Sequence, residues 1–137
     1  MDVHIFSQPV TFGDCDPAGI VFYPNVFRWV DAAFHDCLRP AGGHAAICRR
    51  LGAVGLGLID VNARFRSPIL DGDRVDLRLS IESWGQRSVS LAYRACVGDK
   101  LVFEAREVRA LFIKGDAGMT AGDLSPFREM MERQGHG

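Results

Sequence analysis

Residues 24–39 read PNVFRWVDAAFHDCLR, and this stretch decides the fold. Arg28, Asp31, His35 and Arg39 form one narrow polar stripe at spacings of three and four residues, whereas apolar side chains cover most of the circumference. Pro24 is well placed for the first turn of a helix. A helix that is apolar on nearly all sides is buried, so the pattern predicts one core helix over residues 24–39.

The second half of the chain alternates apolar and polar residues with a period of two. Four such segments, at 59–66, 74–82, 89–97 and 101–113, are separated by short turn signals. Strands with one buried and one wet face suit an antiparallel sheet. In the last segment the apolar set slips by one residue, which predicts a β-bulge near Arg106 or Glu107.

Shorter elements complete the predicted fold. We expect a strand over residues 3–12, a short helix over 45–51 and a C-terminal helix with Ser125 as its N-cap. The prediction is an α+β fold in one domain over residues 1–137, with an antiparallel sheet of about five strands wrapped around one long central helix. A curved sheet of this kind has long edges that need pairing, so we also expect a homo-oligomer.

Composition narrows the class of function. The 137 residues are 47% apolar and 24% charged with a net charge of −1, which is ordinary for a globular protein and gives no electrostatic argument for nucleic acid. The N-terminal residues MDVHIFSQPVTF resemble neither a signal peptide nor a membrane span. Four cysteines without a C-x-x-C pair argue against a disulfide framework or zinc site, so we expect a cytoplasmic protein without a metal or other cofactor.

The segment GDCDPAG, residues 13–19, precedes the predicted helix and contains the candidate chemistry. Unpaired amides at a helix start can polarise a carbonyl, and the Tyr23 amide is a candidate donor because Pro24 has no N–H. A nearby carboxylate, Asp14 or Asp16, would then attack that carbonyl or activate water. On these residues alone an ordinary turn with Asx-type hydrogen bonds is the favoured interpretation. A metal site and a Cys15 nucleophile are weaker alternatives.

The longer segment GDCDPAGIVFYPNVFRWVDAA, residues 13–33, resembles the 4-hydroxybenzoyl-CoA thioesterase family of hot-dog proteins, which carry a D-x-D-x-x-G loop. The resemblance implies a hot-dog fold and an acyl-CoA thioesterase acting on 4-hydroxybenzoyl-CoA or a related aromatic acyl-CoA. It implies that Asp16 is the nucleophile or general base and that the Tyr23 amide polarises the thioester carbonyl. It also implies no metal, and a dimer or tetramer with active sites at subunit interfaces.

The same resemblance suggests substrate contacts. Asp31 matches a position that contacts the aromatic hydroxyl, and it lies about 12 Å along the helix from Tyr23, although a salt-bridged surface residue is the alternative. Gly19 and Phe22 are further acyl-binding candidates; an aromatic such as Phe22 is more often simply core.

For the CoA portion, the family's basic turn corresponds to residues 84–88, where Arg87 is the one basic residue and Ser88 follows it. Arg64, on the wet face of a strand, is another phosphate-binding candidate or ordinary surface charge. A non-catalytic acyl-CoA-binding module and a short-chain aliphatic acyl-CoA thioesterase remain as alternatives for the whole protein.

Overall fold

The computed structural model describes residues 2–134, and Met1 and residues 135–137 of the predicted domain lie outside them. Residues 2–134 form three α-helices, six strands and two short 3₁₀ turns at Phe12–Asp14 and Arg39–Ala41. The strands are β1 (Asp2–Pro9), β2 (Gly55–Phe65), β3 (Arg74–Trp84), β4 (Val89–Val97), β5 (Lys100–Gly115) and β6 (Gly118–Ala121). The helices are α1 (Pro24–Cys37), α2 (His44–Leu51) and α3 (Ser125–Arg133).

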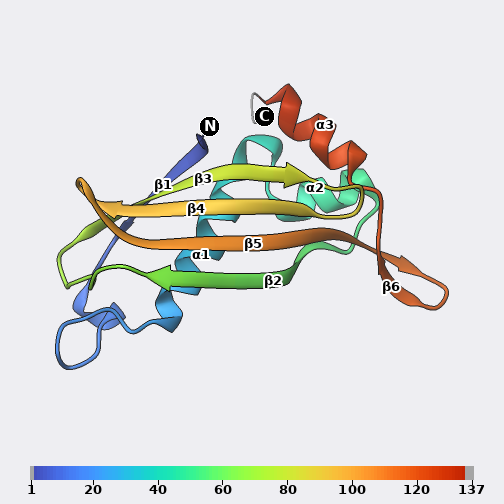
Figure 1. The fold of residues 1–137 in the computed structure, drawn as a ribbon. Helices are drawn as coiled ribbons and strands as arrows, with labels where there is room; N and C mark the ends of the chain where they lie inside the picture. Colours follow the sequence, from blue (N-terminus) through green and yellow to red (C-terminus); the bar gives the residue numbers. More distant parts are fainter. Residues whose placement is uncertain (1, 135–137) are drawn as a thin grey trace.

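All strand pairs are antiparallel, in the order β1-β3-β4-β5-β2, with β6 added to the end of β5. The sheet curves in front of α1, so that one face covers the helix and the other faces outward (Figure 1). The predicted sheet around one long helix is therefore confirmed. Strand β2 forms one edge of the sheet and β1 the other.

Helix α1 forms because its apolar residues repeat on one face at helical spacing. Six of its side chains are buried against the sheet: Val26, Trp29, Val30, Ala33, Phe34 and Cys37. Burying each large side chain of this kind contributes about 1.5–3 kcal/mol, so packing on the sheet stabilises α1. No helix within residues 2–134 is long and apolar enough to cross a membrane.

The predicted bulge near Arg106 or Glu107 is wrong. Residues 103–109 pair with β4 without a register shift, and the extra residue on β5 is Val102. In the pairing with β2 a bulge does lie beside Val108 and Arg109, but its extra residue is Ile59 on β2 and not a residue of β5. The core face of β5 runs without interruption through Phe103, Ala105, Glu107, Arg109 and Leu111, all of them buried. Because two of these five residues are charged, the hydrophobic pattern of the sequence changes face where the backbone does not.

Several element ends also differ from the prediction, among them the end of α1, which stops at Cys37, the end of β1 and the start of α3. Strand β1 stops at Pro9, because the chain turns at Val10 and enters the 3₁₀ turn, with the Thr11 amide donating to the Asp14 carboxylate. Ser125 is the first residue of α3 and not its N-cap. The Asp123 carboxylate accepts hydrogen bonds from the Ser125 amide and hydroxyl.

Candidate active site

The segment from Asp14 to Phe22 forms a short antiparallel hairpin ahead of α1. The Phe22 amide donates to the Asp14 carbonyl, and the Asp16 amide donates to the Ile20 carbonyl, each at 2.9 Å. The Gly19 amide donates to the Asp16 carbonyl at 2.9 Å, and Gly19 has φ of +80°, which strains any residue with a side chain. Gly19 therefore shapes the tip of the hairpin through its backbone.

Asp16 is exposed at this tip, and its carboxylate has one occupied and one open oxygen. Oδ1 accepts the Ala18 amide at 2.9 Å and the Ile20 amide at 3.4 Å. Oδ2 accepts no hydrogen bond from residues 2–134. The Asx-type turn expected from the sequence is thus present, and it holds a carboxylate whose second oxygen is not bonded by the turn's own amides.

Asp14 supports the loop. Its Oδ2 accepts the Thr11 amide at 3.0 Å, its Oδ1 lies 3.2 Å from Arg28 Nη2, and its carbonyl accepts the Asn25 side-chain amide at 2.8 Å. These contacts tie the hairpin to the first turns of α1. Partial burial, followed by the charges of neighbouring carboxylates, raises the pKa of the Cys15 thiol, which disfavours a thiolate nucleophile here.

Tyr23 precedes α1, and its amide donates no hydrogen bond to any other residue from 2 to 134. The unpaired amides and the helix dipole together make this position favourable for a partly negative oxygen. An apolar groove of about 360 Å³ opens beside it, lined by Ile20, Val21, Tyr23, Val26, Phe65, Arg66, Ser67, Pro68 and Ile69. Phe22 is 54% exposed and packs edge-on against the Tyr23 ring next to this groove, so it is not a core residue.

Asp31 lies on the side of α1 and is held by an arginine from the sheet. Nη2 of Arg109 donates to Asp31 Oδ1 at 2.8 Å and to Glu107 Oε2 at 2.9 Å, and Nε of Arg109 donates to Glu107 Oε1 at 3.1 Å. Arg109 is 2% exposed and Glu107 1% exposed, whereas the Asp31 side chain is 50% exposed. Asp31 is therefore salt-bridged through Oδ1, and its Oδ2 accepts no hydrogen bond within the described part of the chain.

Other elements complete this buried network. The Tyr93 hydroxyl donates to Glu107 Oε1 at 2.6 Å, Nη1 of Arg109 donates to the Leu56 carbonyl at 3.1 Å, and the guanidinium lies 4.0 Å from the Phe34 ring centroid. Burial and the Glu107 charge raise the pKa of Tyr93, so it stays a donor. Burial alone would lower the pKa of Arg109, but its bonds to Glu107 outweigh burial and raise it. Two carboxylates and one guanidinium leave one excess negative charge, on the exposed side at Asp31.

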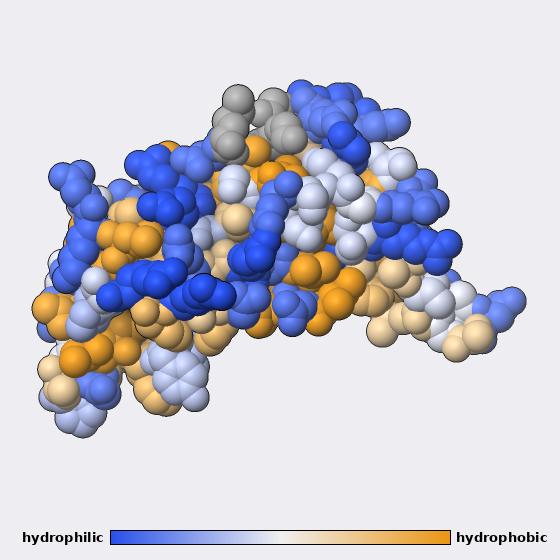
Figure 2. Space-filling model, viewed as in Figure 1, coloured by the Kyte–Doolittle hydropathy of each residue, from blue (hydrophilic) through white to orange (hydrophobic). Residues whose placement is uncertain are grey.

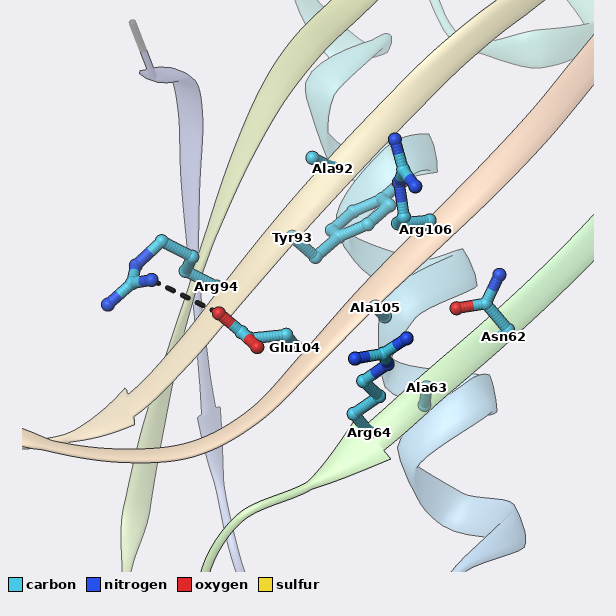
Figure 3. A pocket seen from close by; sticks show the side chains of 9 residues that line it. All are labelled: Asn62, Ala63, Arg64, Ala92, Tyr93, Arg94, Glu104, Ala105 and Arg106. Carbon is cyan, nitrogen blue, oxygen red and sulfur yellow. Dashed lines mark hydrogen bonds and ion pairs between the residues drawn. The ribbon is translucent and has the colours of Figure 1, made fainter.

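The predicted CoA-binding residues do not gather in one place. Arg87 and Ser88 lie in the turn between β3 and β4, beside the start of α3, where the Arg87 charge helps lower the pKa of Asp123. Arg64 and Arg94 both pair with Glu104, so they lie at the same level of the sheet. Arg94 is six residues after Ser88, which places this level about 20 Å from the turn at the rise of a strand. Its side chain lines a groove on the outer face of the sheet (Figure 3).

Sequence reasoning missed the network of Glu107 and Arg109. The available signal was a pair of charged residues two apart, each where strand periodicity calls for an apolar residue. Such a pair also fits a strand with a β-bulge that moves both side chains to the solvent face. The partners of Arg109 on β2 and α1 lie 53 and 78 residues before it, outside any local pattern.

Comparison with known proteins gives consistent similarities. A family model described as the thioesterase superfamily matches residues 18–104. The chain is 36% identical over 112 residues to a 4-hydroxybenzoyl-CoA thioesterase of Pseudomonas sp. strain CBS-3, covering 75% of this chain and 78% of that protein. It is 28% identical over 91 residues to a 1,4-dihydroxy-2-naphthoyl-CoA hydrolase of a Picosynechococcus species, covering 66% of this chain and 62% of the relative.

The fold shows the same similarity. The solved structure of the Pseudomonas 4-hydroxybenzoyl-CoA thioesterase matches with a TM-score of 0.81 at 28% identity, over 93% of this chain and 96% of the other. The hot-dog fold implied by residues 13–33 is therefore confirmed.

Proposed function

Because the chain belongs to the thioesterase superfamily and is a thioester hydrolase, we propose that its substrate is an acyl-CoA with a hydroxylated aromatic acyl group. The observation that carries this proposal is the segment before α1, in which Asp16 keeps Oδ2 without a hydrogen bond, and Ile20 and Tyr23, with its unbonded amide, line an apolar groove. The curated relatives are named for hydroxybenzoyl and dihydroxynaphthoyl thioesters, which fit the same substrate class.

In the proposed reaction the thioester oxygen accepts the Tyr23 amide at the start of α1. This contact polarises the carbonyl and stabilises the oxyanion that forms on attack. Asp16 acts through Oδ2 in one of two ways. It either attacks the carbonyl carbon and releases the CoA thiolate, leaving a mixed anhydride for water to hydrolyse, or it takes a proton from a water that attacks directly.

At the far end of the acyl group, Asp31 supports selection of a hydroxyl. The ion pair with Arg109 fixes Oδ1, which leaves Oδ2 as an anionic acceptor on a half-exposed side chain. A hydrogen bond from a neutral hydroxyl to a charged group is worth about 1.5–3 kcal/mol, so an acyl group that lacks the hydroxyl would bind less well.

We propose that residues 1–137 form one domain that works as a cytoplasmic homo-oligomer, at least a dimer, with active sites at the subunit interface. Edge strand β2 supports the oligomer, because Leu58, Ile59 and Phe65 on it are 43%, 56% and 51% exposed. The cytoplasm fits four cysteines among which residues 2–134 form no disulfide. Light scattering at micromolar concentration tests the assembly, and a monomer would contradict it.

The test of function is thiol release from a panel of benzoyl-, hydroxybenzoyl-, phenylacetyl- and straight-chain acyl-CoAs. Asp16→Asn should lower kcat about 10²- to 10⁴-fold and leave acyl-CoA binding measurable, because the amide keeps the acceptor at Oδ1 but is neither base nor nucleophile. Asp71→Asn, an exposed aspartate in the neighbouring turn, is the matched control. Full turnover by Asp16→Asn would refute the catalytic role. Binding without turnover in the unmodified protein would instead indicate an acyl-CoA-binding module.

A further inference from the structure

The outer face of the sheet carries a polar groove of about 640 Å³ on the side opposite α1 (Figure 3). Strand register places its outward side chains in two rows across β2, β5 and β4, with Ala92 as the small residue that leaves space between longer neighbours. The rows are Asn62–Arg106–Ala92 and Arg64–Glu104–Arg94. Hydrophilic residues dominate the middle of this face (Figure 2).

The groove has more positive than negative charge. Arg66 donates to Glu104 Oε2 at 2.9 Å through Nη2, and Nη1 of Arg94 donates to Oε1 at 3.2 Å. Arg64 on β2 is the cross-strand neighbour of Glu104, on the side opposite Arg94. It forms no hydrogen bond or ion pair with residues 2–134. The Arg66 bond, with the charges of all three arginines, lowers the pKa of Glu104, which is therefore ionised at neutral pH. Three guanidinium groups around one carboxylate leave an excess of two positive charges.

Arg106 does not reduce this excess. It lies in the next row and pairs with Glu82 outside the groove, so its charge is balanced by a residue that is not part of the lining. Arg64 is thus the arginine of the groove with the most hydrogen-bonding capacity left for a ligand. A guanidinium of this kind suits phosphate oxygens, which it can bind through two parallel N–H groups.

The outer groove is connected to the candidate active site through Arg66. The same arginine lines the apolar groove beside Tyr23 and bonds to Glu104 of the outer groove. Arg64, near the end of β2, is three residues before Ser67 of the apolar groove, a span of at most about 10 Å. One long ligand can therefore place an apolar end beside Tyr23 and an anionic end beside Arg64.

We propose that this outer groove binds the nucleotide phosphates of the CoA portion of the substrate, with Arg64 as the principal contact. The inference rests on the proposed function and deepens it, since an acyl-CoA carries its phosphates at the end of a long pantetheine arm. It also accounts for the single basic residue in the turn at residues 84–88. The occupant is a phosphorylated nucleotide and not a second copy of the chain.

The test compares two substrates with the same hydroxybenzoyl group, the acyl-CoA and the acyl-pantetheine thioester that lacks the nucleotide. Arg64→Ala should raise KM for the acyl-CoA about tenfold, change KM for the pantetheine thioester less than twofold, and leave kcat unchanged for both. Arg74→Ala, an exposed arginine farther along the sheet, is the matched control and should change neither KM. Added salt should weaken acyl-CoA binding by the unmodified protein more than by Arg64→Ala.

A direct measurement of nucleotide binding tests this proposal independently of thioester hydrolysis. Titration calorimetry with adenosine 3′,5′-bisphosphate should show binding that Arg64→Ala weakens about tenfold, even for a protein with no turnover. No detectable binding, or equal KM changes for both substrates, would overturn the proposal. So would an effect of Arg87→Ala in place of Arg64→Ala, which would assign the phosphates to the turn. A changed oligomeric state in Arg64→Ala would instead identify the groove as a subunit interface and would also overturn it.

Discussion

Replacing Arg109 by methionine tests whether the buried network holds the sheet and helix together. The change removes a guanidinium that is 2% exposed, with two bonds to Glu107 and one to Asp31. Glu107, itself 1% exposed, then keeps the Tyr93 hydroxyl as its remaining side-chain partner. Breaking a buried ion pair on one side costs about 3–5 kcal/mol, because the remaining charge is buried and uncompensated.

Urea unfolding followed by circular dichroism measures this cost. With an m value of about 2 kcal/mol per molar urea, a loss of about 4 kcal/mol lowers the midpoint by about 2 M. All variants are compared at one protein concentration, since subunit association also stabilises the fold.

Two further variants make the Arg109 experiment decisive. Glu107→Gln combined with Arg109→Met removes both charges and keeps an acceptor for Tyr93, so it should recover at least half of the loss. Arg106→Met removes an exposed arginine from the same strand and should cost less than about 1 kcal/mol. If Arg109→Met is no worse than Arg106→Met, or the double variant no better than Arg109→Met, the ion-pair reasoning is refuted.

Three further predictions concern single side chains. Asp31→Ala should lower kcat/KM about 10- to 100-fold for 4-hydroxybenzoyl-CoA but much less for benzoyl-CoA, and equal losses would remove its proposed hydroxyl contact. Burial lowers the pKa of His35 below 6.5, so the folded protein binds fewer protons there than the unfolded chain, and stability falls as the pH drops below about 6.5. The loss of Tm between about pH 7.5 and 5.5 should therefore shrink in His35→Gln, and an unchanged loss would contradict this. The raised pKa of Cys15 predicts slower alkylation at about pH 8 than for a free cysteine, with faster reaction in Asp71→Asn; a rate equal to that of free cysteine would count against it.

The fold was predictable where side-chain periodicity and burial agree. Strands β3 and β4 alternate without exception in their central residues, and α1 shows one continuous apolar face, so short-range pattern was enough. The pattern failed on β5, where Glu107 and Arg109 occupy core positions. A buried charge pair is stable only with partners that a local window does not contain.

The candidate site was predictable in part for a similar reason. The hairpin geometry of Asp16 and Gly19 follows from local turn chemistry, and Tyr23 from the start of the helix at Pro24. A spacing of four residues reaches His35, whose Nε2 lies 3.4 Å from Asp31 Oδ1. The arginine that holds Asp31 comes from a strand 78 residues later, which such spacings do not reach. The separation of Arg64 from Arg87 likewise follows from strand register.

The position of Arg109 also bears on how long the native state survives. Its contacts join α1, β2 and β5 across 53 and 78 residues, so they form only after the helix has docked on an assembled sheet. Interactions absent from the folding transition state slow unfolding and leave the folding rate nearly unchanged. The Arg109 guanidinium should therefore slow unfolding, and with it proteolysis of the native protein, without changing the folding rate.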